Sequence, residues 1–174
     1  LLAAGLAAPL PAWSTLPGTL TPRTLVFPRD HGTHNDTRTE WWYLTGHAQD
    51  AAGRAFGFQV TFFRSRVDVA QALSGRLAAR QLLFAHAAIT DVQGGQLWHD
   101  ERIARWNGAP GGPVDAALAD TDVRLAGWSF QREAGVYHTD IVGDELRLTL
   151  RAEPTQALLQ QGEQQLLQNL QFKA

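Results

Sequence analysis

Short runs of alternating apolar and polar residues, separated by turn-forming residues, constrain the fold of this chain more than any other feature. From residue 54 to residue 64, large apolar side chains occupy every second position: Phe56, Phe58, Val60 and Phe62. From 145 to 152, leucines alternate with arginine and threonine in the same way. A period of two places successive side chains on opposite faces of a strand, so the pattern predicts strands with one buried face. Helical periodicity is almost absent before the last residues of the chain.

The alternating runs and the turn residues between them predict an antiparallel fold. The expected strands are 40–48, 54–64, 80–91, 97–105, 122–125, 128–132, 136–142 and 145–152. Turns are expected at 50–53 and at Gly94–Gly95, and the Gly- and Pro-rich stretch 107–113 is expected to be a loop. About seven to nine strands at this spacing predict an all-β fold, as an antiparallel barrel or a strongly curved sandwich.

Three regions fall outside this pattern. Residues 65–79 have a weak helical period and are expected to form a short helix or a lid. The Gln-rich end has leucines at helix-like spacing, which indicates a terminal amphipathic helix or a tail unrelated to the fold. Residues 1–20 are apolar and rich in small residues, which indicates a signal-peptide remnant or, alternatively, a disordered arm. The expected organisation is thus an arm at 1–20, one domain at 21–162 and a divergent tail at 163–174.

Length and composition narrow the class of protein. A chain of 174 residues suits one domain, and 44% hydrophobic with 18% charged residues is typical of a folded protein. The formal net charge of −2 gives no long-range attraction to nucleic acid, so none is expected as a partner. The absence of cysteine excludes disulfide and thiolate chemistry. If the first residues belong to a signal peptide, the protein is periplasmic or secreted.

Residues 30–43 concentrate groups that transfer protons beside large aromatic side chains, and three interpretations stay open. A carboxylic acid at Asp30 or Glu40, desolvated by the neighbouring aromatic residues, would have a raised pKa and could protonate an alkene while a histidine orients water. Alternatively, His31 and His34 could bind a metal, although their loop spacing is a poor match to known sites. The third interpretation is structural, with ion pairs among Asp30, Glu40 and the nearby arginines and the tryptophans buried as core residues.

Polar residues elsewhere in the chain could likewise belong to the core, to a pocket or to the surface. Alternation places His86 on the face of its strand that it shares with Leu82, Phe84 and Ala88, which would make it a core or pocket histidine. The pair His138 and Asp140 is expected to point inward from its own strand. Arg64 is expected at the surface.

Several motifs together resemble a known family. The segments 27–31 (FPRDH), 39–46 (TEWWYLTG), 57–64 (GFQVTFFR), 84–91 (FAHAAITD) and Glu101–Arg102 are similar to the N-terminal domain of carotenoid 1,2-hydratases and of the AttH-like predicted secreted hydrolases. The likeness covers roughly residues 25–162 and is far more specific than any one motif.

The resemblance implies a lipocalin-like β-barrel domain that is normally followed by a second such domain, absent from this chain. It also implies a long apolar substrate and, in hydratases, the addition of water to a carbon–carbon double bond without a cofactor. The expected catalytic residues are Asp30, His31 and Glu40, and no metal is expected. The expected substrate-binding residues are Trp41, Trp42, Tyr43, Phe58 and His86. Non-catalytic binding of a lipophilic ligand, association with a membrane surface and hydrolysis are the further possibilities.

Overall fold

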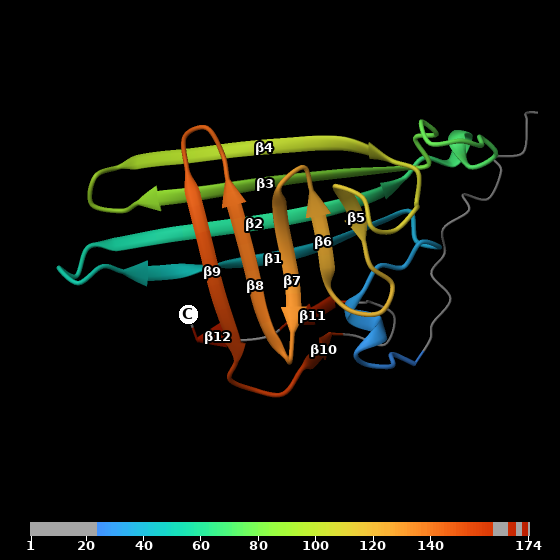
Figure 1. Ribbon diagram of the computed structural model, residues 1–174. Coiled ribbons are helices and arrows are strands. Elements are labelled where there is room, and N and C mark those ends of the chain that lie inside the picture. The colour runs from blue at the N-terminus through green and yellow to red at the C-terminus, as the bar shows by residue number, and fades with distance from the viewer. Residues whose placement is uncertain (1–23, 162–166, 170–171, 174) are drawn as a thin grey trace, which may run out of the picture.

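The structure, a computed structural model, describes residues 24–161, 167–169 and 172–173. Two antiparallel sheets account for most of this part of the chain (Figure 1). The four-stranded sheet contains β1 (Thr39–Gln49), β2 (Ala55–Arg66), β3 (Gln81–Asp91) and β4 (Gln96–Trp106), in that order. The six-stranded sheet has the order β12 (Phe172–Lys173), β9 (Arg147–Pro154), β8 (Val136–Val142), β7 (Trp128–Glu133), β6 (Asp122–Leu125) and β5 (Val114–Ala116).

The sequence-based strands are confirmed with shifts of one or a few residues at their ends. Short β5 was not predicted, because its three residues follow a Gly- and Pro-rich loop and show no alternation. Residues 65–79 contain the single 3₁₀ turn η2 (Asp68–Ala70) in place of a regular helix. A second 3₁₀ turn, η1 (Arg29–His31), precedes β1. Within the described residues, no helix has the length and apolar character needed to cross a membrane.

Of the two alternatives for the C-terminus, the amphipathic helix does not form in the described part of that segment. Leu159–Gln161 (β10) and Leu167–Asn169 (β11) pair as a small antiparallel hairpin, and β12 pairs with Glu153 and Pro154 of β9. The described part of this segment therefore forms strands, because tertiary context routinely outweighs weak local propensity. The expected arm at 1–20 lies outside the described residues.

The two sheets pack face to face, and the core lies between them. In Figure 1 the strands of the six-stranded sheet run across those of the four-stranded sheet, which is the orthogonal form of sheet packing. Phe62 of β2 and Phe130 of β7 stack across this interface with ring centroids 6.3 Å apart. The largest fully buried apolar side chains are Trp128, Phe62, Leu83, Leu125, Ile141, Val60 and Val123.

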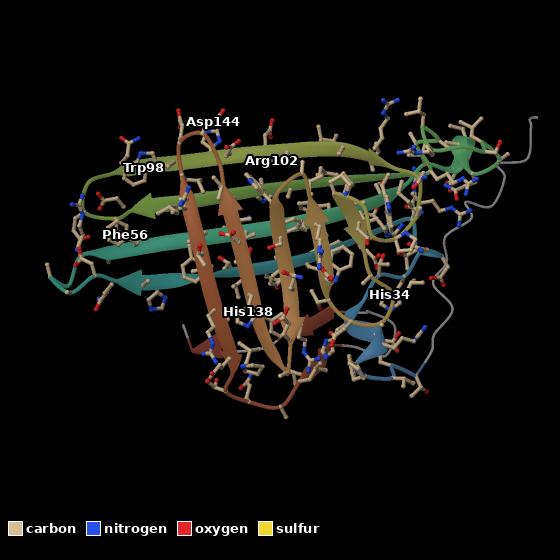
Figure 2. All side chains as sticks on the ribbon, in the orientation of Figure 1. His34, Phe56, Trp98, Arg102, His138 and Asp144 are labelled. Carbon is tan, nitrogen blue, oxygen red and sulfur yellow. The ribbon has the colours of Figure 1, made fainter. Side chains whose placement is uncertain are left out.

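Side chains of β4 fix the turns of the second sheet onto the first. Arg102 donates to the carbonyl oxygens of Ala126 and of Val142, the latter at 2.7 Å. Asp100 accepts the Asp144 amide at 2.8 Å. Figure 2 shows Arg102 and Asp144 near one another where the β8–β9 turn meets β4. These bonds hold the β6–β7 and β8–β9 turns at one edge of the four-stranded sheet.

Two strand edges have no partner strand among the described residues over most or all of their length. Among the described residues, β1 pairs only with β2, and Arg147–Ala152 of β9 pair only with β8. The all-β class is therefore confirmed as two antiparallel sheets, and no closed barrel forms within the described part of the chain.

The buried faces of β3 and β8 differ from those expected. In β3 the core face carries Leu83, Ala85 and Ala87, so His86 points to the outer face of the sheet. In β8 the core face carries Tyr137, Thr139 and Ile141, so His138 and Asp140 point outward. A strand with apolar residues on both faces does not reveal from alternation alone which face the partner sheet covers.

Candidate functional site

The site begins where η1 packs against the loop between β5 and β6. A Cβ atom on Gly32 would lie 2.6 Å from the Leu118 carbonyl oxygen and 2.7 Å from that of Ala117, so only glycine allows this approach. The next amide, Thr33 N, donates to Ala117 O at 2.8 Å. Local contact with the second sheet thus positions the segment that precedes β1.

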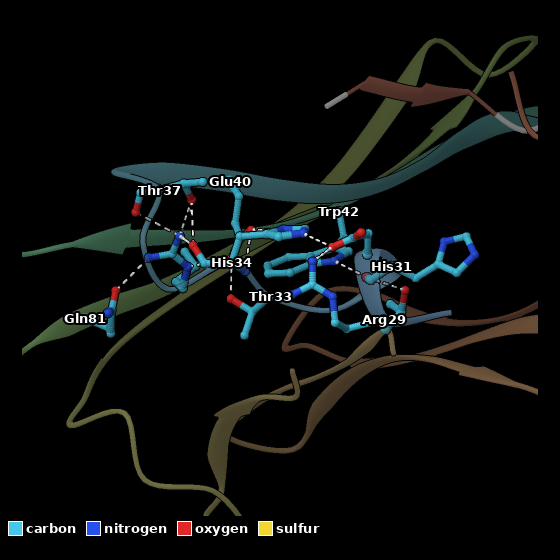
Figure 3. Close-up of polar contacts among 11 residues, drawn as sticks. Arg29, His31, Thr33, His34, Thr37, Glu40, Trp42 and Gln81 are labelled. Carbon is cyan, nitrogen blue, oxygen red and sulfur yellow. Dashed lines mark hydrogen bonds and ion pairs between the residues drawn. The ribbon is translucent and has the colours of Figure 1, made fainter. Parts of the chain in front are cut away.

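His34 joins two carboxylates. Its Nε2 lies 3.0 Å from Asp30 Oδ1, and its Nδ1 lies 3.1 Å from Glu40 Oε2. The His34 amide also donates to both oxygens of Glu40 at 2.9 Å. The side chain of Asp30 is fully buried, and those of His34 and Glu40 are 9% and 14% exposed. Figure 3 shows this arrangement at the start of β1.

Arg64 completes the site from β2, directly opposite Glu40 in the strand register. Its fully buried guanidinium donates from Nε to Glu40 Oε1 at 2.6 Å and from Nη1 to Gln81 Oε1 at 2.8 Å. Nη2 donates to the carbonyl oxygens of His34 at 2.8 Å and Thr37 at 3.0 Å. Asp30, His34, Glu40 and Arg64 form what we call the polar cluster.

The environment lowers the pKa of both carboxyls. Burial by itself would raise the pKa of Asp30, but the Val26 amide, His34 and the charge of Arg29 hold it below the ordinary 3.8. Burial would also raise the pKa of Glu40, but bonds to His34, Thr33 and Arg64 hold it below the ordinary 4.5. The expectation that one of these groups stays protonated near neutral pH is therefore wrong, because hydrogen-bond donors outweigh desolvation.

Both carboxylates therefore act as acceptors for the His34 ring. An ionised carboxylate has no proton to donate, so each ring nitrogen needs its own proton to bond its carboxylate. A doubly protonated His34 ring would bond both carboxylates, whereas either neutral tautomer would donate to only one of them. The polar cluster thus sets the His34 ring and the Arg64 guanidinium against the carboxylates of Asp30 and Glu40.

We expect the stability of the protein to fall in acid because of these depressed pKa values. The unfolded chain takes up protons near the ordinary values of 4.5 for Glu40 and 3.8 for Asp30, before the folded chain does. The stabilisation is therefore complete above about pH 5 and is lost as the pH falls through the lower folded pKa values. Urea unfolding at pH 7, 5, 4 and 3 measures this. A free energy of unfolding that stays constant from pH 7 to pH 3 would contradict it.

His31 lies beside the polar cluster. Its Nδ1 is 3.4 Å from the Tyr137 hydroxyl, and its carbonyl oxygen accepts from Trp42 Nε1 at 3.1 Å and from Thr121 Oγ1 at 2.9 Å. Burial raises the pKa of Tyr137 to about 12. The His31 ring does not belong to the polar cluster. The bonds made by its ring and its carbonyl oxygen tie η1 to both sheets.

The three aromatic residues of β1 do not line one pocket. Trp42 lies on the inner face with Glu40, whereas Trp41 and Tyr43 lie on the outer face and are 48% and 43% exposed. This follows from the period of two, which places neighbouring residues of a strand on opposite faces of the sheet. A role in substrate binding stays a prediction for all three.

Phe58 and His86, the other expected binding residues, also lie on opposite faces. Phe58 packs on the core from the inner face of β2. His86 stands on the outer face, where its Nε2 is 2.9 Å from Gln59 Nε2. No cluster of three or more histidine and acidic residues within the described ranges is arranged to hold a metal ion.

Arg64 is the main residue that sequence reasoning missed. It was expected at the surface, yet it shares the inner face of β2 with Val60 and Phe62, and its side chain is fully buried. The alternation of that strand contained the signal, because residue 64 has the same parity as both of these core residues. His34 was considered only as a metal ligand or water-orienting group, and its place between two carboxylates depends on the turn before β1.

Comparisons with known proteins identify the family. The family described as AttH-like matches residues 19–173. The crystal structure of a Nitrosomonas europaea protein provisionally designated an AttH is 38% identical and superposes with a TM-score of 0.69. The match covers 84% of this chain and 43% of that one, so the chain spans less than half the length of this relative. No curated protein matches the chain. The family match and the shared fold together show that the chain belongs to the AttH-like family.

Proposed function

We propose that this chain is a lipocalin-like domain that binds a long apolar molecule along the inner faces of its two sheets. The observation that carries the proposal is a set of large apolar side chains that pack on the core and yet remain only half-buried: Trp42, Phe58, Ile89, Trp98, Leu148 and Leu150. Partly exposed apolar side chains beside a few polar groups are typical of small-molecule sites.

The polar cluster lies at one end of this apolar surface. Glu40 and Trp42 are neighbours on the inner face of β1, and Gly46, beneath the Phe58 ring, lies six residues from Glu40 along the same strand. Six residues of extended chain span about 20 Å. A molecule of that length would contact the aromatic side chains along its body and bring one end to the polar cluster.

Binding without turnover is the function that the geometry favours for this chain alone. Acid-catalysed hydration requires a proton donor, and neither carboxyl is held in its protonated form. One observation favours hydration as a second candidate, namely His34 between two carboxylates. In that reaction the imidazolium would protonate the alkene, water would add to the carbocation, and the added water would lose a proton to restore His34.

The same proposal includes three further expectations: association with a membrane surface, a periplasmic or secreted location, and a second lipocalin-like domain. An exported binder of lipid-like molecules would meet its ligand at a membrane. The length of the Nitrosomonas relative supports a second domain, since more than half of that chain lies outside the match.

Binding is tested with an acyclic carotenoid, whose absorption band shifts in an apolar site. We expect a shift at micromolar protein. Ile89→Ala should weaken binding by about tenfold, because it removes apolar contacts from this half-buried set of side chains. Ile103→Ala is the matched control, since that isoleucine is 72% exposed on the outer face of the same sheet. Equal effects of the two substitutions, or no spectral shift, would contradict the proposal.

The same samples decide between binding and hydration. Mass spectrometry detects a product that is heavier by one water molecule. For hydration, His34→Gln should remove the product while the absorption shift remains. A product that persists in this variant would exclude His34 as the proton donor, and the absence of product from the unaltered chain would leave binding alone.

A further inference from the structure

The loop between β2 and β3, residues 67–80, exposes its largest apolar side chains. Val69 is 93% exposed, Leu77 is 84% exposed and Leu73 is 54% exposed. The two buried residues of the same loop are alanines. A folded chain normally buries its large apolar side chains before its small ones, so this reversal indicates an interaction surface. In Figure 1 this β2–β3 loop, which contains η2, projects beyond the end of the four-stranded sheet.

Hydrogen bonds within the β2–β3 loop hold its backbone in a defined shape. The side-chain amide of Gln71 donates to the carbonyl oxygens of Val67 at 2.9 Å and of Arg80 at 2.7 Å. The Arg80 guanidinium donates to the Leu73 carbonyl oxygen from Nε at 2.8 Å and from Nη2 at 2.6 Å. The Val67 amide closes the base of the loop by donating to Arg80 O at 2.9 Å. An internally bonded loop therefore presents the exposed apolar side chains.

The loop is positively charged in a chain that is negative overall. Residues 66–80 contain three arginines against one aspartate, a formal net charge of +2, whereas the whole chain has −2. Arg66 is paired with Asp68 at 3.1 Å. Arg76 is exposed and has no ion pair with any described residue. A cation beside exposed aliphatic side chains suits a surface that is anionic outside and apolar inside.

A lipid bilayer matches these features better than a protein surface does. Protein interfaces are enriched in aromatic side chains at their centre, and the β2–β3 loop has no aromatic residue. Aliphatic side chains enter the outer part of a bilayer without needing a complementary shape. Because the loop backbone is irregular, it would stay at the level of the lipid headgroups, and only the apolar side chains would reach the acyl chains.

The β2–β3 loop arises directly from the polar cluster. Arg64 lies two residues before the end of β2, and Gln81, which accepts from Arg64 Nη1 at 2.8 Å, is the first residue of β3. In the proposed function, one end of a long apolar molecule reaches this cluster. A bilayer in contact with the loop would therefore lie beside the polar end of the proposed binding surface.

We propose that the β2–β3 loop is the membrane contact of this domain, with Val69, Leu73 and Leu77 inserted among the lipids of an anionic bilayer and Arg76 paired with lipid phosphate. The proposed function expects association with a membrane surface but assigns it to no part of the molecule. The role of this contact, the transfer of a lipid-like ligand between bilayer and domain, rests on that proposed function. The contact itself depends only on the loop, so it is tested without a ligand.

The first experiment measures binding to lipid vesicles by co-flotation. Vesicles of equal parts phosphatidylcholine and phosphatidylglycerol are compared with vesicles of phosphatidylcholine alone. We expect the protein to float with the mixed vesicles and to bind pure phosphatidylcholine about tenfold more weakly. Arg76→Glu should abolish this difference. Arg147→Glu, the same charge change at an exposed arginine of β9, should preserve it.

The second experiment detects insertion of the loop. The chain has no cysteine, so Leu77→Cys provides a unique position for an environment-sensitive fluorophore. We expect its emission to move to shorter wavelength when the mixed vesicles are added. Leu97→Cys is the matched control, because that leucine is 52% exposed near the opposite end of the four-stranded sheet and should show no such change. Leu77→Gln should also weaken flotation by about tenfold, whereas Leu97→Gln should leave it unchanged.

Four results would overturn the proposal: no flotation, equal binding to both kinds of vesicle, equal effects of Arg76→Glu and Arg147→Glu, or equal emission changes at positions 77 and 97. An emission change at position 77 that appears with rising protein concentration, without vesicles, would also overturn it and would identify a second copy as the occupant. None of these results bears on carotenoid binding, since no carotenoid is present. Flotation and insertion by a protein that fails to shift the carotenoid band would support the membrane contact and contradict the proposed function.

Discussion

Replacing Glu40 by Gln is expected to lower the free energy of unfolding by about 3–5 kcal/mol, the usual range for breaking a buried ion pair. The reason is the guanidinium of Arg64, which has no exposed surface and bonds to Glu40 Oε1 at 2.6 Å. Glutamine fills nearly the same volume but leaves this cation without its anion. The other partners of Arg64, Gln81 and backbone oxygens, are neutral. Urea unfolding at pH 7, followed by circular dichroism, measures the change.

Glu101→Gln is the matched control. Glu101 is exposed on β4, so the same chemical change there should alter stability by less than about 0.5 kcal/mol. Arg64→Met in the Glu40→Gln background should cost less than the sum of the two single changes, because it removes the uncompensated charge. A loss below about 1 kcal/mol for Glu40→Gln would show that the polar cluster does not depend on this ion pair.

Replacing Trp128 by Ala should also cost about 3–5 kcal/mol, the range for removing a large buried aromatic side chain. The Trp128 ring is completely buried at the start of β7. Its Nε1 donates to Val142 O at 3.0 Å, and the Arg102 guanidinium lies 4.9 Å from the ring centroid. The substitution therefore removes core volume, a hydrogen bond and a cation–π contact together.

The control for this prediction is the same substitution at Trp41. That indole is 48% exposed on the outer face of β1, so Trp41→Ala should cost much less than Trp128→Ala in the same urea unfolding measurement. Trp128→Phe should be intermediate, because it keeps a ring in the core but loses the bond to Val142. Equal losses at positions 41 and 128 would mean that the packing between the sheets does not depend on Trp128.

Local sequence predicted which residues of this protein form strands. The runs that became β2 and β9 alternate cleanly, and Gly and Pro mark the turns and the long loop between strands. Steric preference and the period of two act over a few residues, so a single sequence can reveal them. The described part of the C-terminal segment is the exception, since its local pattern allowed a helix while strand pairing made β10, β11 and β12.

Which face of each strand enters the core was decided by the partner sheet. In β3, Phe84 and His86 are larger than Ala85 and Ala87, yet the alanines are buried. The strand register sets Ala85 opposite Phe62, whose ring stacks on Phe130 of the other sheet. Large side chains from two directions already fill that space, so small ones are required from β3.

The sequence by itself determined the strands of this protein and the grouping of Asp30, His34 and Glu40, because those residues are close along the chain. Only the tertiary structure decided their ionisation and their partner. The pairing of β1 with β2 brings Arg64 opposite Glu40, and the segment before β1 bonds to both. A pKa depends on the balance between burial and hydrogen-bond donors, and donors from distant residues exist only once the chain has folded.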